Sequence, residues 1–194
     1  MNKRLIERLI QQRVTGIKSH DGYFFRTDFE HILRGVLLEY VPRGVYVTNF
    51  LFPLFDPVGP NLMYSNRTPG SGFIGKGELS EAALVDHVLS VPELHRSLVT
   101  DPPMSLEDFM DYLPGLRNEH ARLMQAAALI LLRQDDGALE VLDTIGAQLH
   151  SSEAESYRLL RASLQQRSSD AIEYLECVRR ENLRAFGLGR MKSA

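Results

Sequence analysis

The chain has 194 residues, of which 44% are hydrophobic and 24% are charged, and its formal net charge is −3 at pH 7. This composition is typical of a folded globular protein and excludes an intrinsically disordered chain. No apolar run approaches the roughly 18 residues that a membrane span needs, so we expect no membrane partner. A chain with one cysteine suits a reducing compartment, and we expect a cytoplasmic protein. The single cysteine, Cys177, excludes an internal disulfide, and its place in a periodic helix predicts a small core residue.

The first predicted element is an amphipathic helix from Lys3 to about residue 17. Its basic start is not followed by an apolar core and a small-residue cleavage site, so the segment is read as a helix and not as a signal peptide. The apolar positions that recur at helical spacing are Leu5, Ile6, Leu9, Ile10 and Val14.

An aromatic-rich sheet is predicted next, because 11 of the 16 aromatic residues lie between Tyr23 and Phe73. We expect a short strand at residues 23–27 and two longer strands at residues 31–40 and 45–52. The tight connection Val41-Pro42-Arg43-Gly44 should join the two longer strands as an antiparallel hairpin. Residues 31–40 are apolar on both faces, which predicts a central strand. Residues 61–68 are a weaker fourth strand.

A glycine-rich loop is expected at residues 69–77. Gly70 to Lys76 fit the first seven places of a phosphate-binding P-loop, but Gly77 stands where Ser or Thr would hold magnesium. The preceding segment is polar where a P-loop needs a buried strand. We therefore predict no nucleotide cofactor. The loop is either a plain flexible connection or a surface that contacts a protein partner, for which Phe73 and Lys76 are the candidate residues.

Helical signals fill the rest of the chain. Ser80 can cap a helix that runs to Val91, and Ser105 with Asp108 forms a capping-box pattern. Residues 131–139 align with residues 164–172 at an offset of 33, which predicts two αα-hairpins, with Asp135 and Ser169 as helix caps. Repeats of this period resemble the tetratricopeptide type.

The predicted fold class is therefore α+β. An N-terminal helix and an antiparallel sheet of three to four strands precede an all-helical C-terminal half with two repeat-like αα-hairpins. We expect residues 1–77 to form a helix-plus-sheet lobe and residues 78–194 a helical lobe packed on it.

No sequence pattern points to a catalytic site, a metal site or a cofactor. The six histidines form no HExxH motif and none lies near the cysteine at zinc-site spacing. His120, beside Glu119, is read as a polar residue at a helix start. The pair Asp108 and Asp111 lies among surface residues, where paired carboxylates have no dry cleft in which to act as acid and base.

The charges are distributed unevenly along the chain. Residues 1–100 have a net charge of +1, residues 101–157 have 3 basic and 11 acidic groups and a net charge of −8, and residues 158–194 have a net charge of +4. An acidic surface does not favour nucleic acid, which binds Lys and Arg, but it can steer a basic protein. The candidate protein-binding residues are Phe73, Lys76, Asp108, Asp111, Asp135 and Asp136.

One resemblance covers most of the chain. Tyr23-Phe24-Phe25-Arg26-Thr27 and the stretch from Val45 to Phe55, with the helical segments 126–149 and 170–175, resemble a broad group of uncharacterised bacterial α+β proteins. Some members of that group resemble immunity proteins encoded beside secreted toxins. The resemblance implies a cytoplasmic binding protein that neutralises a toxin domain. With the acidic helical surface, we expect the toxin to be basic, such as a nuclease, and the complex to be stoichiometric. Two alternatives stay open: an enzyme with a non-standard active site between sheet and helices, and a peptide-binding adaptor.

Overall fold

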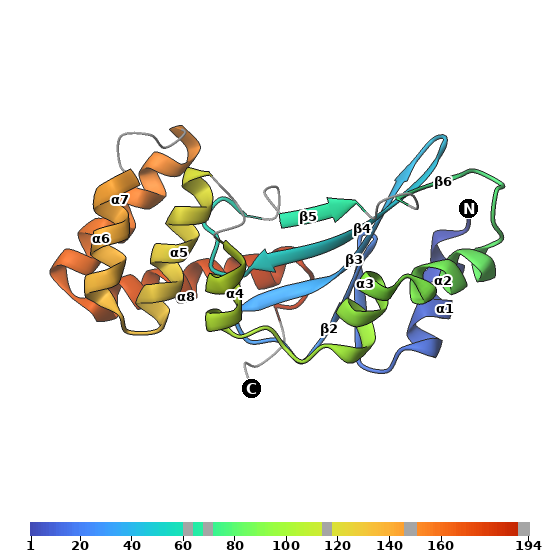
Figure 1. The fold of residues 1–194 in the computed structure, drawn as a ribbon, viewed down its shortest axis with the longest axis horizontal. Helices are drawn as coiled ribbons and strands as arrows, with labels where there is room; N and C mark the ends of the chain where they lie inside the picture. The colour runs from blue at the N-terminus through green and yellow to red at the C-terminus, as the bar shows by residue number, and fades with distance from the viewer. Residues whose placement is uncertain (60–63, 68–71, 114–117, 146–150, 190–194) are drawn as a thin grey trace. The chain divides into compact units, whose positions relative to one another are not determined.

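The predicted mixture of an N-terminal helix, an antiparallel sheet and a helical C-terminal half is confirmed (Figure 1). The structure is a computed structural model that describes residues 1–59, 64–67, 72–113, 118–145 and 151–189. Its contacts divide the chain into two units. Unit 1 comprises Met1–Phe29, Leu33–Phe52 and Met63–Pro103, and unit 2 comprises Glu30–Ile32, Pro53–Leu62 and Met104–Ala194. Residues 78–103, which the sequence analysis grouped with the helical lobe, therefore have most of their contacts in the unit that holds the sheet.

The sheet has the strand order β1-β2-β3-β4-β5, and β6 pairs with β4 beside β5. The hairpin of the two longest strands and the central position of the first of them are confirmed. The pairs β1–β2, β2–β3, β4–β5 and β4–β6 are antiparallel. The strands are β1 (Ile17–His20), β2 (Tyr23–Arg26), β3 (Ile32–Val41), β4 (Gly44–Pro53), β5 (Tyr64–Arg67) and β6 (Phe73–Gly75).

Two predictions about the sheet were wrong. The N-terminal helix α1 (Lys3–Arg13) ends earlier than expected, and residues 17–20 form strand β1. Asp21 and Gly22 both have positive φ angles, 47° and 88°, so they make the tight turn that returns the chain into β2. The glycine-rich segment is not wholly a loop, because residues 73–75 pair with β4 as β6; residues 68–71 and 60–63 lie outside the described residues.

The helices of unit 1 cover one face of the sheet. These helices are α1, α2 (Glu81–Ser90), α3 (Pro92–His95) and the π-helix η2 (Arg96–Thr100). Ser80 caps α2 as predicted, since its hydroxyl accepts a hydrogen bond from the Ala83 amide at 3.2 Å. Alternate residues of the strands pack against Ile6, Ile10, Leu84 and Val88 in one hydrophobic core.

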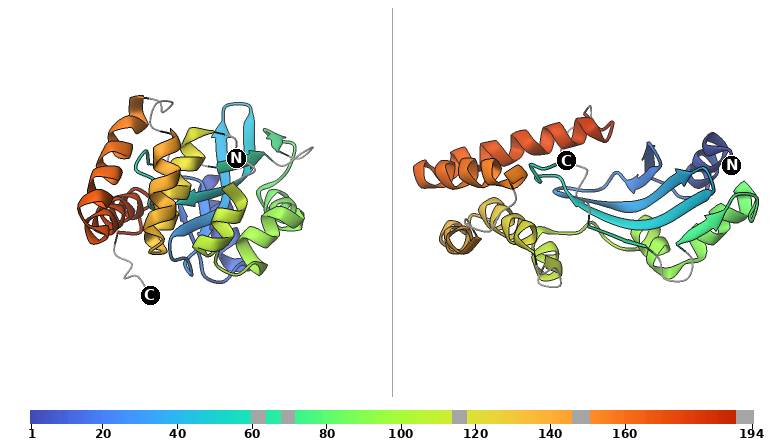
Figure 2. Two further views of the ribbon diagram at one scale, coloured as in Figure 1. Left: turned by 60° about the vertical axis from the view of Figure 1, so that its left-hand side comes forward. Right: turned by 90° about the horizontal axis from the view of Figure 1, so that it is seen from above.

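Unit 2 is built on paired helices. They are α4 (Leu106–Tyr112), α5 (Glu119–Leu131), α6 (Asp135–Ile145), α7 (Ser151–Gln166) and α8 (Ser168–Ala185). α5 lies alongside α6, whereas α7 contacts α8 but runs across its direction, as the yellow, orange and red ribbons of Figures 1 and 2 show. Ser105 and Asp108 form the predicted capping box at the start of α4.

The start of α8 and the cysteine differ from expectation. The N-cap of α8 is Arg167, which makes no side-chain cap bond, and Ser169 lies inside the helix. Asp135 is the first residue of α6. Cys177 is exposed and not a core residue, because the buried face of α8 is made by residues such as Leu175 and Val178 on either side of it. Across the described ranges, no helix combines the length and the apolar character that crossing a membrane requires.

Candidate functional site

A histidine lies between two carboxylates inside unit 2. Nε2 of His120 is 2.8 Å from Oδ2 of Asp56, and Nδ1 is 3.0 Å from Oε1 of Glu153. The Asp56 side chain is 0% exposed, and those of His120 and Glu153 are 11% and 9% exposed. Because three titratable side chains meet here largely out of contact with solvent, this group is the first candidate for a functional site.

Asp56 is fixed by the turn that follows β4. Its backbone amide donates to the Pro53 carbonyl at 3.0 Å, and its Oδ1 accepts a hydrogen bond from the Val58 amide at 2.9 Å. The buried side-chain amide of Asn182, on α8, donates to the carbonyls of Leu54 and Asp56, both at 2.8 Å. One carboxylate oxygen of Asp56 therefore holds the turn while the other faces the imidazole.

The other two members come from the first turns of two helices. Asn118 caps α5 by accepting a hydrogen bond from the Ala121 amide at 2.7 Å, which places His120 at the second position of the helix. Glu153 lies in the first turn of α7. Three segments far apart in the sequence thus meet at one imidazole.

The environment of His120 favours the charged imidazolium. Burial on its own lowers the pKa of His120, but the hydrogen bond and charge of Asp56 and those of Glu153 outweigh burial, so the pKa is raised above 6.5. Nε2 then donates to Asp56, whereas Nδ1 is ion-paired with Glu153 at 3.0 Å in a geometry too poor for a regular hydrogen bond. An imidazolium held this way has no lone pair for a substrate and no nitrogen free to take up a proton, so the group acts as an ionic clamp between three segments.

A second buried polar group lies near the start of β3. Arg179 of α8 is 7% exposed, and its Nε donates to the Glu30 carbonyl at 3.0 Å while its guanidinium pairs with Glu176 at 3.4 Å. His31 stacks edge-on against Phe55, with ring centroids 6.4 Å apart. Burial lowers the pKa of His31, and the positive charge of Arg179 lowers it further against the opposing charges of Glu30 and Glu176. This histidine is therefore held neutral.

Two of the predicted partner-contact residues lie on unit 1. The side chain of Phe73 is 44% exposed and packs on the Tyr46 ring at a centroid distance of 4.8 Å. Lys76 is exposed, and its backbone amide donates to the Arg43 carbonyl at 2.8 Å.

The other four lie on helices of unit 2. Asp108 and Asp111 are exposed on α4, and Asp135 and Asp136 form the first turn of α6. Asp108 has a structural task, since its carboxylate accepts the Ser105 amide in the capping box. Asp135 accepts a hydrogen bond from Ser168 at 3.1 Å. Asp111 and Asp136 make no hydrogen bond or ion pair with another described residue.

The buried group at His120 was missed by reading the sequence. His120 was interpreted as a polar residue at a helix start, which is its local position, but nothing in the spacing of residues 56, 120 and 153 indicates that they meet. One usable signal exists: Asp56 directly follows an apolar stretch, where a buried carboxylate needs a partner.

A scan against protein-family models, a search of curated proteins and a search of solved structures each found no match. Within the part of the chain that the structure describes, no group of three or more His, Cys, Asp or Glu residues is arranged to hold a metal ion. At His120 the nitrogen–oxygen contacts are direct, which leaves no position for an ion between them.

Proposed function

We propose that this chain is an intracellular protein-binding domain whose acidic helices in unit 2 capture a basic protein. The observation that supports the proposal is that two helices carry acidic side chains and no basic ones. α4 contains three carboxylates and α6 contains four, and neither helix contains a lysine, an arginine or a histidine. Both helices pack against α5.

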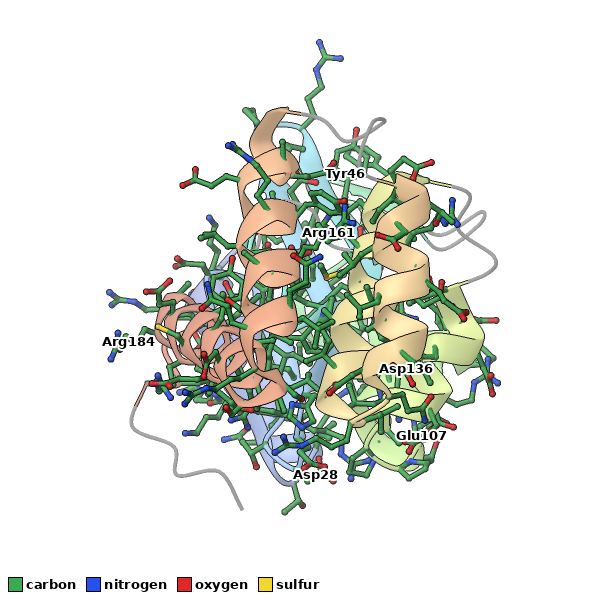
Figure 3. All side chains as sticks on the ribbon, turned by 90° about the vertical axis from the view of Figure 1, so that its left-hand side faces the viewer. Asp28, Tyr46, Glu107, Asp136, Arg161 and Arg184 are labelled. Atoms are coloured by element: carbon green, nitrogen blue, oxygen red, sulfur yellow. The ribbon has the colours of Figure 1, made fainter. Side chains whose placement is uncertain are left out.

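Four of these seven carboxylates are available for contact. Glu107, Asp111, Asp136 and Glu140 are exposed and make no hydrogen bond or ion pair within the described ranges. Figure 3 labels Glu107 on α4 and Asp136 on α6, with their carboxylates at the surface. The remaining three have structural partners: Ser105 for Asp108, Ser168 for Asp135 and Arg161 for Asp143.

An acidic surface of this kind favours a basic protein as the partner. Opposite charges steer diffusional encounter and raise association rates, and a phosphate backbone would be repelled from the same helices. The specific form that we propose is neutralisation of a basic bacterial toxin, such as a nuclease, by a stoichiometric complex. This form rests on the resemblance described above.

An enzyme is the alternative that the buried histidine would favour. Catalysis by His120 would need one ring nitrogen to face a substrate, whereas both nitrogens contact carboxylates. The group supports the fold of unit 2, and so we prefer binding.

The test is quantitative affinity capture from a lysate of the cells that make the protein. The wild-type chain should retain a basic protein in a one-to-one complex. A variant with Glu107→Gln, Asp111→Asn, Asp136→Asn and Glu140→Gln should retain much less of it. Equal capture by both chains, or turnover of a small molecule without any captured protein, would overturn the proposal.

A further inference from the structure

Two neighbouring hollows lie in unit 1, next to the start of α1. The larger has a volume of about 320 Å³ and the smaller about 210 Å³, and Lys3 and Tyr40 line both. The larger lies within the size range of small-molecule sites, which begins near 300 Å³. Neither hollow contains any residue of the acidic helices.

The larger hollow carries acceptors for a cationic group. Glu7, Asp21 and Ser19 line it, together with Lys3 and with His20, whose ring lies 3.6 Å from Asp21. Phe24 and Tyr40 provide apolar walls. The Ser19 hydroxyl donates to Oε1 of Glu7 and accepts a hydrogen bond from Gln11 at 3.0 Å. These hydrogen bonds orient the Glu7 carboxylate, which lines the hollow. Burial, together with the negative charge of Glu7, raises the pKa of Tyr40 to about 12, so its hydroxyl stays a neutral donor and acceptor.

The smaller hollow is lined by basic side chains and by no acidic one. Lys3 and Lys76 line it, together with the apolar surface of Val41 and Pro42. Lys76 is placed there by backbone pairing, because its amide donates to the Arg43 carbonyl at 2.8 Å. The turn also leaves no room for a side chain at Gly44, where a Cβ would lie 2.1 Å from the Ile74 carbonyl oxygen.

The charges of the two hollows do not neutralise one another. The Lys3 ammonium lies 4.7 Å from the centre of the Tyr40 ring, in a cation–π contact. Of the ion pairs between described residues, none joins Lys3 to Glu7. Glu7 and Asp21 line only the larger hollow and Lys76 only the smaller one, while Lys3 lines both, so opposite charges remain at the two ends for a ligand to bind.

We propose that these hollows bind a small zwitterion of the amino-acid or dipeptide class. Its ammonium group contacts Glu7 and Asp21, its carboxylate lies between Lys3 and Lys76, and its apolar part crosses the Tyr40 ring. Such a ligand matches the order of charges along the hollows, and a purely anionic or purely cationic ligand would leave one end repelled.

The experiment is isothermal titration calorimetry of the whole chain with alanyl-alanine. Two probes of the same shape, N-acetyl-alanyl-alanine and alanyl-alanine amide, each lack one charge. We expect alanyl-alanine to bind, and each blocked probe to bind at least about tenfold more weakly, as the loss of one charge-assisted contact implies. Lys76→Gln should weaken binding of the free dipeptide and of the N-acetyl probe, but should leave binding of the amide unchanged.

The matched control is Lys18→Gln, which removes an exposed lysine of β1 that lines neither hollow and should leave affinity unchanged. The second variant is Glu7→Gln. The test does not depend on whether that variant folds, because Lys76 is exposed and its replacement should not disturb the fold. Absence of heat at millimolar dipeptide, or equal affinity for all three probes, would overturn the proposal. Either result leaves protein capture by α4 and α6 untouched, because the two tests share no residue.

Discussion

The hydroxyl of Ser168 donates to the carboxylate of Asp135 across 3.1 Å, and the two residues are the first of α8 and α6. They are 33 positions apart, which is the offset at which the two helical segments align in the sequence. The second helices of both αα-hairpins thus begin at equivalent positions, and one hydrogen bond joins those positions directly.

Replacing Ser168 should therefore loosen the junction of the two hairpins. Ser168→Ala removes a half-buried hydrogen bond, and we expect unit 2 to lose about 1 kcal/mol of unfolding free energy relative to Ser169→Ala. The second variant is the control, since it gives the same gain in helix propensity but removes an exposed hydroxyl. Urea denaturation of both variants measures the difference, and equal midpoints would show that the junction contributes nothing.

The imidazolium of His120 should contribute more to the free energy of unfolding than the Ser168 hydroxyl does. His120→Gln leaves Asp56 buried without its charged partner, and removing one member of a buried ion pair costs about 3–5 kcal/mol. The control is His20→Gln, because His20 is 40% exposed and contacts Asp21 only at 3.6 Å. If denaturant midpoints of the two variants coincide, the group around His120 is not an ionic clamp.

The two buried histidines predict a stability maximum near their ordinary pKa of 6.5. His120 has a raised pKa, so its contribution is complete below 6.5 and is lost as the pH rises through the folded-state value. His31 has a lowered pKa, so the unfolded chain takes up a proton more readily and stability falls as the pH drops below 6.5. Unfolding free energies measured at pH 5, 6.5 and 8 test the expected loss of stability on both the acidic and the alkaline side. His120→Gln should abolish the loss on the alkaline side, and a slope that persists there in the variant would contradict the assignment.

Two glycines give a matched test of the backbone. A Cβ at Gly35 on β3 would lie 1.9 Å from the Phe24 carbonyl oxygen, so Gly35→Ala should push β2 and β3 apart and cost about 3 kcal/mol or more. A Cβ at Gly137 inside α6 meets only the Leu129 side chain at 3.8 Å, so Gly137→Ala should stabilise the protein by about 0.5–1 kcal/mol. The thermal unfolding temperature should therefore fall in Gly35→Ala and rise in Gly137→Ala. A Gly35→Ala chain as stable as the wild type would contradict the strand packing.

Local patterns predicted most of the fold. The hairpin of β3 and β4, the central position of β3, the Ser80 cap and the Ser105–Asp108 capping box all depend on residues that are close in the sequence. The strand β1 was missed because Ile17 continues the helical spacing of α1, and only the turn at Asp21 and Gly22 decides that these residues pair with β2.

The buried site could not be predicted in the same way. Asp56, His120 and Glu153 meet only after the turn at residues 53–59, α5 and α7 have packed within unit 2, and each residue has an ordinary local role at a turn or a helix start. Cys177 shows the same limit, since the rotation of α8 against its neighbours decides which of its faces is buried. The acidic character of α4 and α6, in contrast, can be counted directly from the sequence.

The most direct test of the proposed binding is the association rate of the captured basic partner, measured by stopped-flow at 50 and 300 mM salt. The wild-type chain should associate at least about tenfold faster at the lower salt concentration. The variant with the four exposed carboxylates of α4 and α6 neutralised should lose most of that dependence. A control with Glu39→Gln, Glu93→Gln, Glu173→Gln and Glu181→Gln, which changes the net charge equally but outside these helices, should keep it. Equal loss in both variants, or no salt dependence in the wild type, would contradict capture by α4 and α6.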